Sequence, residues 1–350
     1  MNKDILLQAL NVANKAVASK PLYPIMGCVL LTSKDGRMVI NSSNFDLSIQ
    51  VEIESDTELE IAVPAKKLGE IIGNLADKDV FLKQKDNTLN VKSGKYKANI
   101  NGVVNDYPGV DFSGAMKYVD VIGFREQTQS VTYAASTNVN LPINGILFEL
   151  EGDSITMVST DGIRLAIAKE GYSDVGTGSV LIPNANLREI HKIIGQVKAD
   201  TVGFSIAENS IRFDIRGDLD VKVNSLLISA NFPSYRNIIP DSYSTKAVVR
   251  TSQLVSACKQ ANVISRENNG FVKLTIGNGI WLYTSADIGQ TETFVEATCE
   301  GNIEIGVNID YLMDALASSI MAEISLEFSG SNRPIVLRDK YIHIIMPMQL

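Results

Sequence analysis

Residues that commonly carry catalysis are few in this sequence and do not cluster. Of the two histidines, His343 alternates with isoleucines in a strand-like run, and His191 lies on a predicted helix without a nucleophile nearby. The three cysteines, Cys28, Cys258 and Cys299, are far apart, which is typical of reduced thiols buried in a core. The sequence contains no Cys-x-x-Cys pair, no Gly-x-x-x-x-Gly-Lys phosphate loop and no paired-acid signature. We therefore predict no catalytic residues, no cofactor and no metal site.

The most informative short stretch is residues 159–166, Ser-Thr-Asp-Gly-Ile-Arg-Leu-Ala. It joins two runs of alternating apolar residues, so it predicts a hairpin. Asp161 can bond its own backbone, and Gly162 supplies a positive φ. Related arrangements occur elsewhere, with Ser42-Ser43-Asn44 inside residues 38–51 and Ser285-Ala286-Asp287 inside residues 280–296. Strand, short polar turn and strand therefore occur three times.

The elements that position these turns also repeat. Apolar spacing predicts two helices in each of three copies, and alternating runs between the helices predict many antiparallel strands. The second helix of each copy follows a similar entry, Ile-Ala-Val-Pro, Val-Leu-Ile-Pro or Ile-Gly-Val-Asn. The predicted helices are residues 4–18, 66–75, 125–135, 187–197, 251–264 and 311–318.

We therefore predict an α+β protein of three repeated domains, each with two helices packed on antiparallel sheets. A repeat of this length is long enough to be a domain. The predicted domains are residues 1–117 (N-terminal), 118–243 (central) and 244–350 (C-terminal).

Charge is unevenly distributed along the chain, whose formal net charge is −8. Acidic residues crowd the predicted strands, whereas basic residues lie on the predicted helices or just past their ends. A solvated helix face is the better interpretation for any single lysine, but the repetition favours a shared basic surface. The last helix is an exception, because it carries Asp310 and Asp314 and no basic residue.

Composition excludes a membrane-spanning helix. Apolar residues make up 45% and charged residues 21% of the chain, which is ordinary for a globular protein. No apolar run approaches the roughly 20 residues that a membrane span needs. The amphipathic N-terminal segment lacks the continuous apolar stretch of a signal peptide, so we expect a cytoplasmic protein.

Three motifs together resemble one known family. They are residues 159–166, residues 232–240 (Phe-Pro-Ser-Tyr-Arg-Asn-Ile-Ile-Pro) and residues 346–350 (Met-Pro-Met-Gln-Leu). From end to end the chain resembles the bacterial sliding clamps, the beta subunits of DNA polymerase III. The resemblance implies the DNA clamp fold, in which two chains form a head-to-tail homodimeric ring with helices lining a central hole. Double-stranded DNA passes through the hole without sequence specificity, and the clamp gives the polymerase processivity.

The resemblance also implies partners and a groove for them. Expected partners are the replicative polymerase catalytic subunit, the clamp loader complex, and repair polymerases and mismatch-repair proteins that bind through short peptides. The groove lies between the second and third domains. By resemblance its residues are Ile143, Thr160, Gly162, Ile163, Arg164, Leu165, Pro233, Asn237, Ile238, Asn308, Tyr311, Ile344, Ile345, Met346, Pro347, Met348 and Leu350.

Two further surfaces are expected. Residues that should face DNA through phosphate contacts are Lys15, Lys20, Arg188, Lys192, Lys198 and Lys259. The first domain should meet the third domain of the partner copy, with Val263 and Ile264 as candidate apolar contacts. The chain departs from the family pattern at Ile163, Asn237 and Gln349, where many members carry a histidine or another basic residue, and these departures bear on the choice of client.

Two other classes of protein remain open from the residues alone. An enzyme that acts on nucleotides or DNA would need the acid or phosphate-binding motifs that are absent here. A protein-binding scaffold without a nucleic-acid role would not need basic helices. Salt dependence separates the second class from a clamp, because DNA retention responds to ionic strength.

Overall fold

The computed structural model of the chain describes residues 1–18, 20–104 and 107–350. The chain folds into two compact units, which are described separately. Unit 1 comprises Met1–Val121 and Ala185–Leu227, and unit 2 comprises Ile122–Asn184 and Ile228–Leu350.

Unit 1 is built on an eight-stranded antiparallel sheet in the order β4-β1-β2-β3-β13-β12-β11-β8. A separate three-stranded sheet has the order β5-β6-β7. The strands are β1 (Cys28–Lys34), β2 (Arg37–Ser43), β3 (Leu47–Glu54), β4 (Glu60–Pro64), β5 (Phe81–Lys85), β6 (Thr88–Ser93), β7 (Tyr96–Asn101), β8 (Lys117–Val119), β11 (Thr201–Ile206), β12 (Ser210–Arg216) and β13 (Asp220–Leu226).

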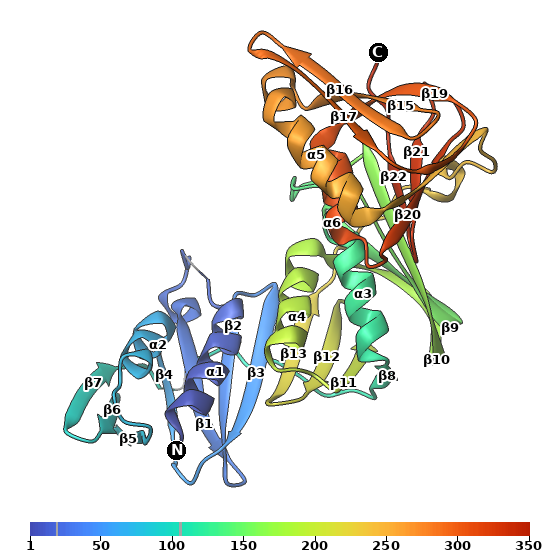
Figure 1. Ribbon diagram of the computed structural model, residues 1–350. Coiled ribbons are helices and arrows are strands. Elements are labelled where there is room, and N and C mark those ends of the chain that lie inside the picture. Colours follow the sequence, from blue (N-terminus) through green and yellow to red (C-terminus); the bar gives the residue numbers. More distant parts are fainter. Residues whose placement is uncertain (19, 105–106) are drawn as a thin grey trace. The chain divides into compact units, whose positions relative to one another are not determined.

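Helices cover one face of this large sheet (Figure 1). Helix α1 (Lys3–Ala13) packs on β2 and β3 and against α2 (Ala65–Gly73). Helix α4 (Asn184–Gln196) lies beside α1, because Gln8 donates to the Gln196 carbonyl at 3.4 Å. Short 3-10 turns, η1 (Asn14–Ala16) and η2 (Pro24–Gly27), follow α1.

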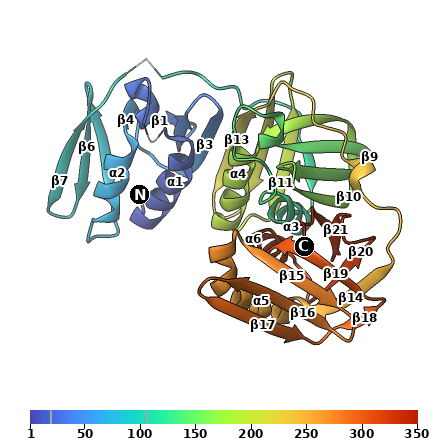
Figure 2. The ribbon, with the colours of Figure 1, turned by 90° about the horizontal axis from the view of Figure 1, so that it is seen from above.

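Unit 2 contains a seven-stranded sheet, β18-β14-β20-β21-β22-β10-β9, and a four-stranded sheet, β17-β16-β15-β19. Figure 2 shows α5 lying along the β16–β17 hairpin. The strands are β9 (Gly145–Thr160), β10 (Arg164–Pro183), β14 (Thr245–Arg250), β15 (Phe271–Ile276), β16 (Ile280–Ala286), β17 (Gly289–Val295), β18 (Thr298–Glu300), β19 (Ile303–Asn308), β20 (Glu323–Phe328), β21 (Ile335–Arg338) and β22 (Ile342–Ile345). The helices are α3 (Val121–Val131), α5 (Thr251–Ser265) and α6 (Ile309–Ser318), with 3-10 turns η3 (Pro142–Asn144), η4 (Arg236–Ile238) and η5 (Arg266–Asn268).

Each large sheet joins strands of two predicted copies. In unit 1, β3 of the first copy pairs with β13 of the second, and in unit 2, β10 of the second copy pairs with β22 of the third. Because the second copy contributes strands to both sheets, three sequence repeats fold into two compact units. The predicted domain limits at residues 117 and 243 stay a prediction.

A buried hydroxyl ties each of the first two turns to a helix end. The Ser42 hydroxyl donates to the carbonyl of Ala13, the last residue of α1, at 2.6 Å. The Ser159 hydroxyl donates to the carbonyl of Val131, the last residue of α3, at 2.5 Å. Carbonyls in the last turn of a helix lack a partner within the helix, so each serine adds a hydrogen bond at a helix end. The Val131 carbonyl also accepts from the Ala134 backbone at 3.2 Å.

Two helix predictions were wrong in their bounds. The first helix was expected to reach residue 18, but α1 ends at Ala13, and Ala18 donates to the Met26 carbonyl instead of continuing the helix. The third helix was expected over residues 125–135, yet α3 spans Val121–Val131, four residues earlier at both ends. The buried Gln127, which donates to the carbonyls of Ile155 and Ala168, breaks the apolar period of α3.

A buried carboxylate anchors the end of α6. The side chain of Asp339 is fully buried and accepts hydrogen bonds from Ser319 and Ile320, just past α6, and from the backbone of Tyr341. Burial alone would raise the pKa of Asp339, but the nearby His343 and these hydrogen bonds outweigh it and hold the pKa well below its usual range. The His343 Nε2 lies 3.7 Å from Asp339 Oδ1, so this contribution is electrostatic rather than a hydrogen bond.

We predict that Asp339→Asn lowers the free energy of unfolding by about 2 kcal/mol at pH 7, because a buried charged acceptor is lost. The depressed pKa means that ionised Asp339 stabilises the fold above its unfolded pKa of about 3.9. This stabilisation disappears as the pH falls toward the lower folded pKa. Urea unfolding should therefore show a constant difference between the two proteins down to about pH 4.5 and a shrinking one below it. A difference that stays unchanged to about pH 3 would contradict this account.

Candidate functional site

The turn between β9 and β10 is held rigid by its own hydrogen bonds. The Asp161 Oδ1 accepts from the backbone of Ile163 and Arg164 at 2.9 Å each, and the Thr160 hydroxyl oxygen accepts from the Gly162 backbone at 3.0 Å. Gly162 has φ +93°, which favours glycine. The turn leaves Ile163 45% exposed and Gly162 open, so a backbone can approach closely here.

The same turn occurs in the first copy, between β2 and β3 of unit 1. There Phe45 donates to the Ser43 hydroxyl, and Leu47 donates to the Asn44 side chain. Phe45 takes the place of Gly162, with φ +75°. The first two copies therefore share the turn geometry, but of these two turns only that of the second copy has a glycine at this position.

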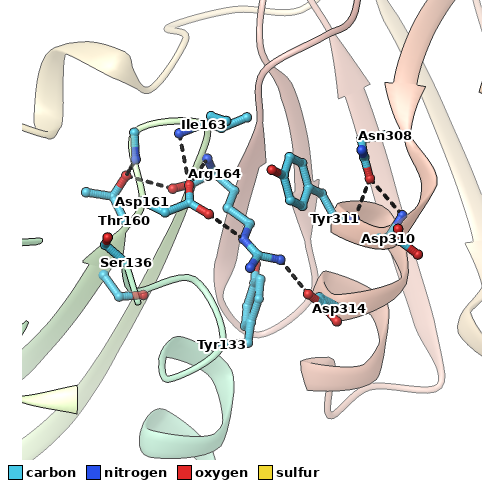
Figure 3. Close-up of polar contacts among 12 residues, drawn as sticks. Tyr133, Ser136, Thr160, Asp161, Ile163, Arg164, Asn308, Asp310, Tyr311 and Asp314 are labelled. Carbon is cyan, nitrogen blue, oxygen red and sulfur yellow. Dashed lines mark hydrogen bonds and ion pairs between the residues drawn. The ribbon is translucent and has the colours of Figure 1, made fainter. Parts of the chain in front are cut away.

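Arg164 braces this turn against α6, as Figure 3 shows. Its Nε donates to Asp161 at 2.9 Å, and its Nη1 donates to Asp314 on α6 at 2.5 Å. The guanidinium lies 5.3 Å from the ring centre of Tyr133 and 4.7 Å from that of Tyr311. Burial works to lower the pKa of Arg164, but Asp314 and Asp161 outweigh it and raise the pKa. The arginine is thus fixed in place as one wall of the site.

The last residues of the chain form a second wall. Strand β22 pairs with β10, and the chain then continues past Ile345 along the turn. Met346 donates to the Ile163 carbonyl and Met348 donates to the Gly306 carbonyl, both at 2.9 Å. A side chain at Gly306 would lie 2.6 Å from the Met348 carbonyl oxygen, so only glycine allows this approach. The segment is pinned, yet Met346 stays 40% exposed.

Other predicted groove residues divide into exposed and buried ones. Pro233, Asn237 and Ile238 are exposed on the segment around η4. Tyr235 of that segment packs in the same apolar cluster as Leu165 and Ile344. The remaining exposed or half-buried members are Ile143, Pro347 and Leu350.

Three predicted groove residues support the walls instead of facing a ligand. Leu165, Ile344 and Ile345 are at most 2% exposed, so their side chains belong to the core. The Asn308 side chain caps α6 by accepting from Asp310 at 2.9 Å and Tyr311 at 3.3 Å. Ser136 links two other members, because its backbone donates to the carbonyls of both Ile143 and Thr160.

Two members of the site were missed at the level of sequence. Asp314 and Tyr133 hold Arg164, although they lie far from it in the chain. Asp314 had a signal, because α6 carries acids where the other helices carry bases. No sequence feature indicated a role for Tyr133, because it lies in an apolar stretch just after α3.

The predicted DNA-facing residues of unit 1 gather on neighbouring helices. Glu189 on α4 pairs with Lys15 at 3.3 Å and with Lys192 at 2.7 Å. Burial would raise the pKa of Glu189, but the two lysines outweigh it and lower the pKa. Arg188 is exposed on the same helix, and Lys198 pairs with Asp218 at 3.2 Å.

The remaining predicted residues of the DNA and dimer surfaces are also accessible. Lys20 is exposed in unit 1, and Lys259 is exposed on α5 of unit 2. On the same helix Val263 is 67% exposed and Ile264 is half-buried.

The described ranges contain no cluster of three side chains able to hold a metal ion. None of the helices described is long and apolar enough to cross a membrane. The cysteines are all free; Cys258 is buried, whereas Cys28 and Cys299 are only half-buried.

Comparison with protein-family models assigns the chain to a family. The models named DNA polymerase III beta subunit match as the N-terminal domain at residues 1–111, the central domain at 119–234 and the C-terminal domain at 236–349. Since they span almost the whole chain, the chain belongs to the DNA polymerase III beta subunit family. The family consists of non-catalytic sliding clamps, which confirms the family, the clamp fold and the non-enzymatic function predicted from sequence.

Relatives and solved structures agree with this assignment. The chain is 26% identical to a beta sliding clamp of Synechocystis sp., over 99% of this chain and 97% of that protein. It is likewise 26% identical to one of Streptomyces coelicolor, over 100% and 98%. The solved sliding clamp of Bacillus subtilis aligns with a TM-score of 0.91 and 25% identity, covering 100% of this chain and 98% of that one.

We predict that Gly162→Ala lowers the free energy of unfolding by about 1–2 kcal/mol, because alanine resists a positive φ. No atom lies within 4 Å of the added Cβ, so backbone strain alone is tested. Gly171→Ala on β10 is the matched control, since that glycine has no positive φ and its nearest atom lies at 3.9 Å. Urea unfolding measures both variants, and equal stability for the two would show that the turn is not strained.

Proposed function

We propose that two copies of this sliding clamp close head to tail into a ring around duplex DNA in the cytoplasm. The ring would tether the replicative polymerase catalytic subunit, and a clamp loader complex would open it. Repair polymerases and mismatch-repair proteins would dock short peptides in the groove formed by the 160–165 turn, α6 and the 346–350 tail. The observation that carries the docking proposal is the tail, which is pinned by Ile163 and Gly306 yet exposes methionine.

Two unpaired strand edges support the ring. Strands β3 and β10 each follow a turn and each pair with the last strand of the next copy, β13 or β22. The corresponding strand of the third copy, β17, is at the edge of its sheet, and the last strand of the first copy, β7, is also at an edge. Exposed edges tend to pair with another chain. Pairing of β17 with β7 of a partner copy would repeat the two joints within the chain.

The charges beside these edges are complementary. The three-stranded sheet of unit 1 exposes a set of lysines, and the β17–β19 region of unit 2 exposes a set of glutamates. Opposite charges favour head-to-tail association and disfavour like ends meeting. At the edges themselves, Lys95 and Lys97 are exposed at β7, and Glu292 and Glu296 are exposed at β17. Lys83, Lys85 and Lys92 lie farther away on β5 and β6, and Glu300 and Glu304 lie on β18 and β19.

We assign DNA contact to the helices. Lys15, Arg188 and Lys192 share the α1–α4 surface, and Lys20, Lys198 and Lys259 extend the set. Lysine and arginine on helices can contact phosphates without reading bases, which leaves the protein free to move along the duplex.

Charging the candidate dimer contact should open the ring. We expect Val263→Glu with Ile264→Glu to give a single-chain solution mass and to leave nicked circular DNA as fast as linear DNA, because a buried charge disfavours association. Val263→Glu alone, at a site 67% exposed, should act in the same direction without disturbing the core. Val139→Glu, at a site 79% exposed, is the control and should stay dimeric. A dimer that survives both substitutions at 263 and 264 rules out this placement.

Removing the tail should abolish docking. Deletion of residues 346–350 should lower the affinity for a fluorescent peptide from the cognate polymerase at least tenfold. An apolar anchor contributes about 2 kcal/mol or more to such binding. Dimer mass and retention on circular DNA should not change. Met348→Ser should also lower the peptide affinity. Met321→Ser is the control and should leave the affinity unchanged, because Met321 is 51% exposed and lies outside the groove. Unchanged peptide affinity after the deletion would remove the groove assignment.

A further inference from the structure

Two carboxylates converge on a single guanidinium at the groove. Arg164 is bound by Asp161 at 2.9 Å and by Asp314 at 2.5 Å, so the cluster carries one excess negative charge. Asp310 lies one turn before Asp314 on α6 and is exposed. The Asp310 Oδ1 accepts from Asn262 on α5 at 3.1 Å. Residues four apart lie near the same helix face, so Asp310 adds a second negative charge one turn from Asp314.

The arginine is not available to an acidic ligand. Its Nε and Nη1 already donate to carboxylates, and the rings of Tyr133 and Tyr311 lie within about 5 Å of the guanidinium. Its side chain is only 13% exposed, whereas that of Asp314 is 51% exposed. A ligand that reaches this wall therefore meets the carboxylate of Asp314 before it meets the arginine.

Other groove positions do not offset the negative charge. The neighbouring side chains at Ile163, Asn237 and Gln349 are neutral. Arg236, beside Asn237, pairs with Glu149 at 3.0 Å and with Glu151 at 3.5 Å. Among the groove residues that the structure describes, the charge left over is negative.

We propose that Asp314, supported by Asp310, makes the groove select client peptides that carry a lysine or arginine beside their apolar anchors. The inference rests on the proposed docking function and specifies its ligand. The apolar tail and the open glycine bind any extended apolar segment, and the acids of α6 then discriminate among such segments by charge. Like charges that meet at an interface are disfavoured, so an acidic residue at the same peptide position is rejected.

The test is a double-mutant cycle, in which one residue of the peptide and one carboxylate of the protein are changed separately and together. The probes are versions of the cognate polymerase peptide in which the residue beside an apolar anchor is Lys, Gln or Glu, titrated against the full-length protein by calorimetry. The Lys peptide should bind about two- to fivefold more tightly than the Gln peptide, and the Glu peptide about two- to fivefold more weakly, which is the range of partly exposed ion pairs. These ratios should shrink as salt rises from about 0.05 M to about 0.5 M.

Variants assign the selectivity to particular carboxylates. Asp314→Asn should bring the Lys-to-Gln ratio close to one, and Asp310→Asn, which leaves the Arg164 brace intact, should reduce it in part. Asp287→Asn removes an exposed carboxylate elsewhere in unit 2 and should leave the ratio unchanged.

Several outcomes overturn the proposal. If Asp314→Asn weakens all peptides equally, Asp314 is only a brace for Arg164. If the Glu peptide binds as well as the Lys peptide to the unmodified protein, the groove does not select by charge. If the Gln peptide itself does not bind, the docking function fails, and that result is distinct from loss of selectivity.

Discussion

The pairing of strand edges is the constraint on which the rest of this structure depends. Two strands of each copy are placed to pair with a neighbouring copy, the strand after its turn and its last strand. Within the chain, β3 bonds to β13 and β10 bonds to β22, so four of these edges are satisfied. The unpaired backbone N–H and C=O groups of an exposed strand edge can pair with a strand of another chain. The corresponding strands β7 and β17 are left at sheet edges, and the proposed head-to-tail dimer would pair them.

The joint between β10 and β22 also creates the candidate docking site. Because β22 pairs beside the 160–165 turn, the chain that leaves it must run past Ile163, where Met346 donates to the Ile163 carbonyl. The equivalent joint in unit 1 has the same geometry, with Leu226 donating to the Asp46 carbonyl. What differs is local chemistry: Gly162 and Arg164 stand where the first copy has Phe45 and Leu47. The two joints therefore share a backbone arrangement, and the proposed groove depends on the few residues that differ between them.

Sequence patterns predicted the features that depend on neighbours in the chain. The 159–166 turn, the threefold order of elements and most helix ranges follow from local spacing. Features that depend on distant residues were not visible. The polar partners of Gln127, Ile155 and Ala168, are more than 25 residues away, and without them the start of α3 could not be placed. The partner of Arg164, Asp314, likewise lies on α6 of another copy. The burial of Ile344 and Ile345 also appears only in the folded chain.

The lysines proposed to face DNA are themselves partly neutralised, which suits a protein that must slide. Glu189 accepts from Lys15 and Lys192 at once, and Lys198 pairs with Asp218. Each pair lowers the net charge offered to phosphates and therefore the number of counterions released on binding. A fully unpaired basic surface would release more counterions and bind DNA more tightly. In a chain of net charge −8, retention on DNA would come from the closed ring, and the lysines would only keep the duplex centred without fixing its register.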